Sequence, residues 1–215
     1  MKIPFSQDQF FSVFEAYNLS LWPIQILFYG LGVVCIVVMV KNGLKYSRML
    51  FSVLSFFWLW MGVVYHILYF SSINTAAYLF GFVFIIQGLA FFYFGVIREK
   101  IKFNFNLELS GIIGLVLIVY ALAAYPVISY FVGHIYPRSP TFGVPCPTTI
   151  FTFGLLLHST TRVPWFIVLI PLLWSLIGLS AALNLSVNED FGLPVAGLLA
   201  SPILLFYKPI GQTKK

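Results

Sequence analysis

The sequence predicts an all-α integral membrane protein with seven transmembrane helices, an N-terminus outside and a C-terminus in the cytoplasm. Three observations support this prediction. First, 60% of the residues are hydrophobic and 8% are charged, with a mean hydropathy of +0.98, so the chain lacks the polar surface of a soluble domain. Second, apolar runs of membrane-spanning length recur along it. Third, basic residues gather in every second segment between these runs, which places them on one side of the membrane.

The apolar runs approach the roughly 20 residues that cross a bilayer core. They predict one membrane domain, residues 1–215, with spans near residues 19–40, 50–70, 74–97, 109–133, 148–161, 164–185 and 191–207. The fifth span is short. We expect no cleavable signal peptide, because the polar stretch Ser6 to Gln9 stands where a signal peptide has its apolar run.

Basic residues in short loops mark the cytoplasmic side of a membrane protein. If the N-terminus is outside, ten of the twelve fall in cytoplasmic segments: Lys41, Lys45, Arg48, Arg98, Lys100, Lys102, Arg162, Lys208, Lys214 and Lys215. Only Lys2 and Arg138 lie outside, whereas a six-span or N-in arrangement would divide the clusters. The net charge of +6 therefore predicts contact with anionic membrane lipids and not nucleic-acid binding.

The N-terminal segment, residues 1–18, is predicted to contain a short amphipathic helix at the outer interface. Ser6 followed three residues later by Gln9 forms a capping-box pattern. Phe10, Phe11 and Phe14 supply an apolar side that suits the membrane interface.

A proline-rich loop at residues 134–147 is the one long irregular segment between two spans, and it is predicted outside. Pro147 suits the first position of a helix, which places Cys146 at the cap, where thiolate chemistry or metal ligation is favoured. Two interpretations remain: a preorganised site or pore mouth, or a rigid lid whose prolines avoid unsatisfied amides. The other cysteine, Cys35, is expected to be a packing residue within the first span.

Most polar side chains that suit ligand binding are predicted in the outer half of the bundle. These candidates are His66, Asn74, Gln87, His134, Tyr136, Arg138, Cys146, Thr148 and Thr149, with Gln87 near mid-bilayer. Ionisable or amide side chains within spans are functional candidates by default.

Each candidate also has a purely structural interpretation. His66 suits a hydrogen bond to a backbone carbonyl, and His134 and Tyr136 suit interfacial anchoring. Thr148 and Thr149 suit the first-turn amides of the fifth span, as Glu189 and Asp190 suit the start of the seventh. His158, near Arg162, is expected to belong to the cytoplasmic collar.

Two classes of seven-span protein were tested against the residues. A retinal protein needs a lysine within its last span, and Lys208 lies at the cytoplasmic end of that span, which excludes retinal as a cofactor. A zinc or copper site is open to His66, His134, Cys146 and Glu15, because a thiolate with imidazoles suits these metals. No intramembrane carboxylate accompanies them, so the metal signal is weak.

Several ordered motifs resemble a family of bacterial multi-pass membrane proteins, domain of unknown function 6064. They include Trp22-Pro23, Trp58-Leu59-Trp60 with Tyr65-His66, Tyr136-Pro137, the run Pro145-Cys146-Pro147-Thr148-Thr149-Ile150-Phe151-Thr152-Phe153-Gly154, and Pro171-Leu172-Leu173-Trp174-Ser175. The resemblance spans nearly the whole chain. It implies a bacterial inner membrane and carries no catalytic assignment.

The leading functional prediction is a non-enzymatic transporter or binding protein for a small solute or ion, with its site in the outer half of the bundle. This prediction rests on the polar residues that gather at the outer side of the bundle beside a short fifth helix, a pattern typical of a discontinuous element at a binding site. The second hypothesis is a metal- or cysteine-dependent intramembrane enzyme acting at the extracytoplasmic face, and the third is a membrane assembly or lipid-packing role. The sequence carries no signal for oligomeric state.

Overall fold

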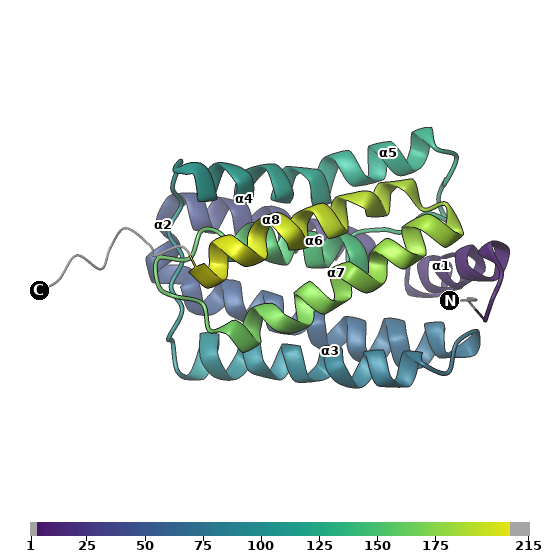
Figure 1. The fold of residues 1–215 in the computed structure, drawn as a ribbon, viewed down its shortest axis with the longest axis horizontal. Helices are drawn as coiled ribbons and strands as arrows, with labels where there is room; N and C mark the ends of the chain where they lie inside the picture. The colour runs from purple at the N-terminus through teal and green to yellow at the C-terminus, as the bar shows by residue number, and fades with distance from the viewer. Residues whose placement is uncertain (1–3, 207–215) are drawn as a thin grey trace, which may run out of the picture.

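The computed structural model describes residues 4–206, which fold into an elongated bundle of helices with no β-strand in that range (Figure 1). The α-helices are α1 (Gln7–Leu21), α2 (Ile24–Trp60), α3 (Ala77–Phe91), α4 (Leu109–Val119), α5 (Tyr125–Phe131), α6 (Pro145–Leu156), α7 (Trp165–Leu185) and α8 (Gly192–Phe206). Three π-helical segments continue α2, α3 and α4: η1 (Met61–Tyr69), η3 (Phe92–Ile97) and η4 (Tyr120–Ala124). Two short 3₁₀ turns, η2 (Phe70–Ser72) and η5 (Asn188–Phe191), complete the set.

Helix α2 is interrupted and folds back on itself. Asn42 has φ −166° and ψ 69°, which is not helical. The Phe28 and Phe57 rings nevertheless lie 5.5 Å apart, although 29 residues of straight helix would separate them by roughly 44 Å. The chain therefore reverses near Asn42, and the two halves of α2 pack side by side (Figure 1).

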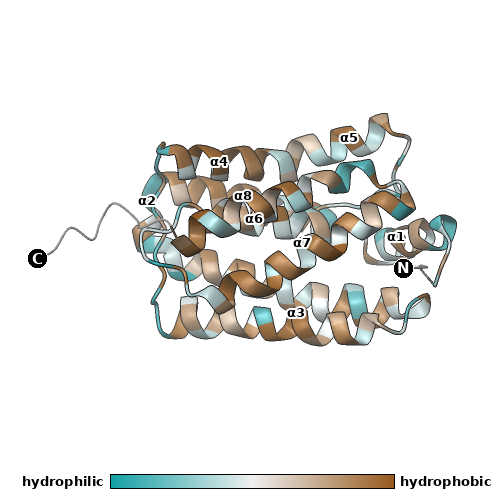
Figure 2. Cartoon of the chain, viewed as in Figure 1, coloured by the Kyte–Doolittle hydropathy of each residue, from teal (hydrophilic) through white to brown (hydrophobic). Residues whose placement is uncertain are grey.

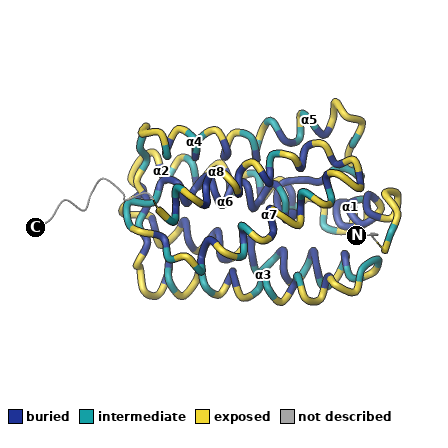
Figure 3. Tube along the Cα trace, viewed as in Figure 1, coloured by how far each residue is buried: buried dark blue, intermediate teal, exposed yellow. Residues whose placement is uncertain are grey.

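Five helical stretches are long and apolar enough to cross a membrane: Ile24–Ser72, Ala77–Ile97, Leu109–Phe131, Trp165–Leu185 and Asn188–Phe206. Their outward faces are apolar and exposed (Figures 2 and 3). Such a continuous apolar exterior is typical of contact with lipid and not with water. The stretches agree closely with the third, fourth and sixth predicted spans, and they indicate a membrane protein.

Helix α6 lies in the centre of the bundle, where Figure 3 shows it buried among the longer helices. It begins at Pro145 and ends at Leu156, earlier at both ends than the predicted span at residues 148–161. Its 12 residues cover roughly 18 Å, well short of a bilayer core. Every residue of α6 except Cys146 is buried.

Helix α1 lies across one end of the bundle (Figure 1). The predicted capping box is present, because Ser6 Oγ accepts from Gln9 N and Gln9 Oε1 accepts from Ser6 N. The predicted lipid-facing role of its phenylalanines is wrong, however, since Phe10, Phe11 and Phe14 are buried within the protein. They pack against the ends of the spanning helices because aromatic surface here finds protein partners, including Tyr65 and Phe70.

Basic side chains gather at the opposite end of the bundle from α1. The Asn42 turn, the 98–108 loop and the 157–164 loop meet there, joined by Phe103 N donating to Ser47 Oγ (2.9 Å) and Thr160 N donating to Lys102 O (2.8 Å). Lys102 donates to Glu99 (2.6 Å) and lowers the pKa of this exposed carboxyl. Lys2, Tyr207, Lys208, Lys214 and Lys215 lie outside the described residues.

Two glycine pairs let helix backbones approach closely. A Cβ built on Gly154 of α6 would lie 2.8 Å from Gly114 O of α4, and one on Gly114 would lie 2.7 Å from Gly154 O. Gly62 and Gly81 form a similar pair between η1 and α3. Small residues at such contacts allow close van der Waals packing, which stabilises helix association in lipid, where the hydrophobic effect between helices is absent.

Candidate functional site

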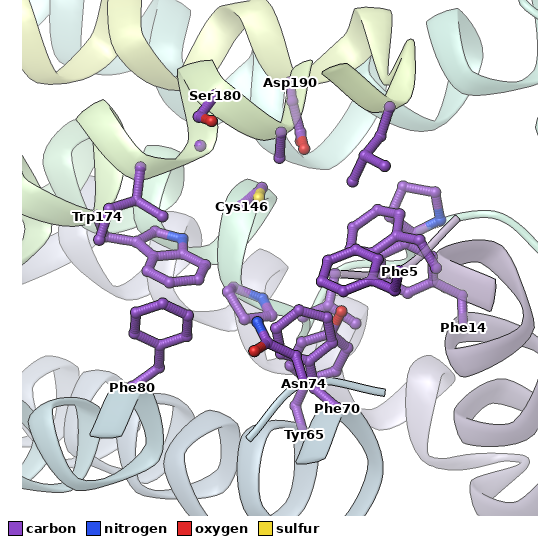
Figure 4. A pocket seen from close by; sticks show the side chains of 18 of the residues that line it. Phe5, Phe14, Tyr65, Phe70, Asn74, Phe80, Cys146, Trp174, Ser180 and Asp190 are labelled. Atoms are coloured by element: carbon purple, nitrogen blue, oxygen red, sulfur yellow. The ribbon is translucent and has the colours of Figure 1, made fainter. Parts of the chain in front are cut away.

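A cavity of ≈ 590 Å³ opens near the α1 end of the bundle (Figure 4). Most of its lining is apolar or aromatic, and the polar groups at its walls are Tyr65, Asn74, Cys146, Trp174, Ser180 and Asp190. The walls come from the N-terminal segment with α1, from η1 and η2, from α3 with the turn before it, from the start of α6 with the loop before it, and from α7 and η5. The volume is within the range of small-molecule sites, roughly 300–1,000 Å³, which are typically apolar with a few placed polar groups.

The start of α6 is held at the cavity by a buried loop. The chain leaves α5 and re-enters the bundle, so that Phe142 and Val144 are buried before the helix begins. Irregular backbone is tolerated at this depth because protein surrounds it. Gly143, whose φ is +106°, donates its N–H to Thr148 Oγ1 (3.1 Å), which fixes the turn into the helix.

The predicted cap position of Cys146 is wrong. Val144 is the N-cap of α6, Pro145 is the first helical residue and Cys146 is the second. Because Pro145 and Pro147 have no N–H, Cys146 is the only one of the first three helical residues with an amide to satisfy. Its side chain lines the cavity between Trp174 and Asp190 (Figure 4).

Glu189 and Asp190 are buried acids whose side chains do not cap α8 as predicted. The Asp190 carboxyl accepts a short hydrogen bond from the Tyr125 hydroxyl of α5. Glu189 lies 2.9 and 3.1 Å from His134 Nδ1 through its two oxygens. The carboxylates instead link η5 to α5 and to the loop that follows α5, because a buried acid gains more from side-chain donors than from a short 3₁₀ turn.

His66 lies next to the cavity but does not line it. Its ring is enclosed by aromatic side chains, with centroids of Phe84 at 4.6 Å and Trp174 at 5.1 Å. Neither ring nitrogen has a hydrogen-bond partner, so the predicted bond to a backbone carbonyl is absent. The Trp174 indole stands between His66 and the cavity and is itself without a partner for its N–H.

Other predicted site residues lie apart from this cavity. Gln87 donates to Ile167 O (3.0 Å) within the helix interfaces. Thr149 Oγ1 is buried without a partner, and Thr148 supports Gly143. Tyr136 is exposed beside Trp22, as expected for an interfacial anchor.

His134 and Arg138 line a second, smaller hollow of ≈ 390 Å³ against α1. Arg138 donates to Asp8 Oδ1 (2.6 Å) and lies 3.8 Å from Glu15, and the hydrogen bond to Asp8 raises the pKa of Arg138. All of these groups are exposed or partly exposed, so their ion pairs contribute little stability. This hollow is separate from the apolar cavity.

Asn18 of α1 ties the proline-rich loop to the bundle, a role the sequence did not reveal. Its amide donates to Pro137 O (2.7 Å) and Ser139 O (2.8 Å), while its carbonyl accepts from Thr141 Oγ1 (2.9 Å). Asn18 is fully buried. An asparagine from α1 therefore fixes the proline-rich loop in place, in addition to its prolines.

The four predicted metal ligands do not meet. His66 is enclosed by aromatic rings, His134 pairs with Glu189, Cys146 faces Asp190, and Glu15 lies beside Arg138. Within residues 4–206, no three His, Cys, Asp or Glu side chains are grouped so that they could bind a metal ion. The sequence placed these residues at one end of the bundle but could not predict their side-chain directions.

The sequence did not predict the roles of two cavity residues, Trp174 and Asp190, or of Tyr125, which donates to Asp190 from outside the cavity lining. Trp174 stood within an apolar span, and Tyr125 looked like one of many aromatic residues. The signal available for Asp190 was an acid directly before a span, and capping was the simpler interpretation.

Comparison with known proteins supplies a family and no activity. No curated protein and no solved structure matches the chain. Residues 7–212 match the family of unknown function DUF6064. Because this match covers nearly all of the 215 residues, the chain belongs to that family.

Proposed function

We propose that the protein spans the bacterial inner membrane seven times, with its N-terminus outside. As one helix, the 49 residues of Ile24–Ser72 would measure roughly 74 Å, more than twice a bilayer core. The reversal at Asn42 divides them into two crossings, which gives six, and the buried loop that re-enters the bundle makes the seventh together with α6. The basic end of the bundle faces the cytoplasm.

Single-cysteine labelling tests this orientation. In a background of Cys35→Ala and Cys146→Ala, an impermeant maleimide on intact cells should label Thr75→Cys at the α1 end. Lys45→Cys, near the Asn42 turn, should react only after permeabilisation. Both positions are exposed, so the opposite pattern would refute the orientation.

The proposed function is binding and transport of a small amphipathic solute through the cavity near the α1 end. The observation that carries this proposal is the cavity of ≈ 590 Å³ with mainly apolar walls and a few inward polar groups. It lies where a short, proline-started helix begins in the middle of the bundle. Discontinuous helices at such positions are typical of transporter sites.

Cys146 reports occupancy of the cavity, because it is the one α6 residue with exposed surface and it lines the wall. The Cys35→Ala variant, in nanodiscs, leaves Cys146 as the single thiol. We expect 3,3-dimethylbutyl benzoate, a neutral amphipathic ester, to slow its reaction with N-ethylmaleimide. At ten times the dissociation constant the rate should fall about tenfold.

A cavity-filling pair of variants provides the control. Ala181 lines the cavity, so Ala181→Trp should abolish protection by the ester. Leu183 is exposed on the same helix outside the cavity lining, so Leu183→Trp should preserve it. Equal labelling with and without the ester in both variants and in the parent would refute a binding cavity. Transport is then tested by uptake of radiolabelled ester into proteoliposomes.

A cysteine-dependent enzyme is the second candidate, favoured by the Cys146 thiol and the Asp190 side chain lining the same cavity. Cys146→Ala separates the two functions. A binding protein should keep its affinity for the ester, measured by equilibrium dialysis, whereas an enzyme would lose hydrolysis or transfer completely.

A further inference from the structure

The cavity contains a buried carboxylate that has no basic partner. Asp190 is 2% exposed and receives its short hydrogen bond from the neutral Tyr125 hydroxyl. Among residues 4–206, no lysine, arginine or histidine forms a salt bridge with it, since the nearby His134 pairs with Glu189. A buried acid without a basic partner favours its uncharged form, and a cation that enters the cavity would supply the partner that favours the carboxylate.

The positive end of α6 reduces this charge but does not remove it. Cys146 is the second residue of α6 and lies next to Asp190 in the cavity wall (Figure 4), which places the helix N-terminus near that side chain. A helix terminus is equivalent to roughly half an elementary charge. With two prolines among the first three residues of α6, few amides remain to bind an anion.

The other cavity walls suit an organic cation. Aromatic rings from α1 and the residues just before it, and from η1, η2, α3 and α7, surround the space: Phe5, Phe10, Phe14, Tyr65, Phe70, Phe80 and Trp174. Ring faces attract ammonium groups, most strongly where water is excluded. An apolar or aromatic body would therefore pack beside its own charged group.

Trp174 provides a second, independent sign of a ligand. Its side chain is buried (8% exposed) and lines the cavity, and its Nε1–H makes no hydrogen bond, although the Cys146 thiol lies nearby. In Figure 4 the indole points toward the space beside Cys146, which lies between Trp174 and Asp190. A buried donor without a partner costs free energy, and a ligand oxygen near the ammonium group would satisfy it.

We propose that the cavity binds a lipophilic ammonium ion that carries a hydrogen-bond acceptor, with Asp190 as its counter-ion and Trp174 Nε1–H as its donor. This inference rests on the proposed binding function and specifies the solute. A free cation fits better than a phospholipid headgroup, because the phosphate beside a lipid ammonium would face the acidic side chain of Asp190.

Two isosteric probes test the charge. Benzoylcholine carries a quaternary ammonium and an ester, and 3,3-dimethylbutyl benzoate has the same shape without the charge. Protection of Cys146 from N-ethylmaleimide in the Cys35→Ala protein measures both affinities. We expect benzoylcholine to bind at least about tenfold more tightly, because a desolvated ion pair adds to the apolar contacts.

Three variants assign the contacts. Asp190→Asn should weaken benzoylcholine by about 10- to 100-fold and leave the neutral ester unchanged, which also shows that the variant is folded. Glu189→Gln, the adjacent acid that pairs with His134, should alter neither affinity by more than about twofold. Trp174→Phe should weaken both probes by a similar factor, about fivefold, since both lose the same hydrogen bond.

The outcomes distinguish the two proposals. If the neutral ester protects Cys146 but Asp190→Asn leaves benzoylcholine binding unchanged, the cation inference fails and the binding cavity stands. If neither probe protects, the proposed function itself fails. The measurement in phosphatidylglycerol nanodiscs is repeated with phosphatidylethanolamine added, and competition by that lipid would overturn the free cation in favour of a lipid headgroup.

Discussion

Replacing Asn18 with alanine should release the proline-rich loop from α1. The change removes two amide donors to Pro137 O and Ser139 O and the acceptor of Thr141 Oγ1. At roughly 1 kcal/mol for each net hydrogen bond, the free energy of opening the loop should fall by about 3 kcal/mol. Because each 1.4 kcal/mol is tenfold in an equilibrium constant, local opening should rise by about 100-fold.

Amide hydrogen exchange measures this opening directly, because exchange of a protected amide follows the local opening equilibrium. In nanodiscs, residues 137–144 should exchange about 100-fold faster in Asn18→Ala, whereas α4 should be unchanged. Asn184→Ala is the control, since this exposed side chain bonds only to Ser180 on its own helix. An increase of less than about threefold, under the value of one hydrogen bond, would refute the reasoning.

Three further predictions concern packing, burial and surface charge. Gly154→Ala should lower the free energy of unfolding by about 1–3 kcal/mol through overpacking. Gly30→Ala is the control and should not lower it, because nothing lies within 4 Å of a Cβ at that position. Detergent unfolding titrations compare the two variants, and equal effects would contradict the close contact of α4 with α6. His66→Phe should raise stability by about 1–3 kcal/mol, because it removes two buried nitrogens without partners; a lower melting temperature would mean that His66 has an essential polar partner. Arg138→Ala should cost less than about 1 kcal/mol, because its ion pairs are exposed, and a salt-independent loss above that value would contradict the assignment.

Hydropathy alone predicted which segments form membrane-spanning helices, but it predicted the ends of these helices less well. Lipid requires long apolar stretches, so the predicted spans at residues 74–97, 109–133 and 164–185 agree closely with the helices observed. The predicted boundary near Leu19 failed because α1 continues to Leu21 before the chain turns at Trp22 and Pro23. Propensity does not distinguish an interfacial helix from the start of a span when both are apolar.

The site was predictable as a region and not as a set of contacts. Basic clusters placed Asn74 and Cys146 toward one end of the bundle, and both line the cavity. His66 was assigned to the same region, but its ring faces Phe84 and Trp174. The direction of a side chain depends on how its helix is rotated about its axis. Packing between helices determines this rotation, and it could not be predicted from one sequence.

The π-helical segment η1 has a consequence for how this wall of the cavity can change. It holds Tyr65, which lines the cavity, and His66, which faces the aromatic cluster behind it. A π-helix contains more residues per turn than an α-helix, and such segments are often found at functional sites. Deleting one residue from Met61–Tyr69 would allow this segment to become an ordinary α-helix, so that only the residues within it turn and the helix on either side keeps its register. Length variation at this point of the chain would therefore exchange the residue presented to the cavity while leaving the rest of the helix in place.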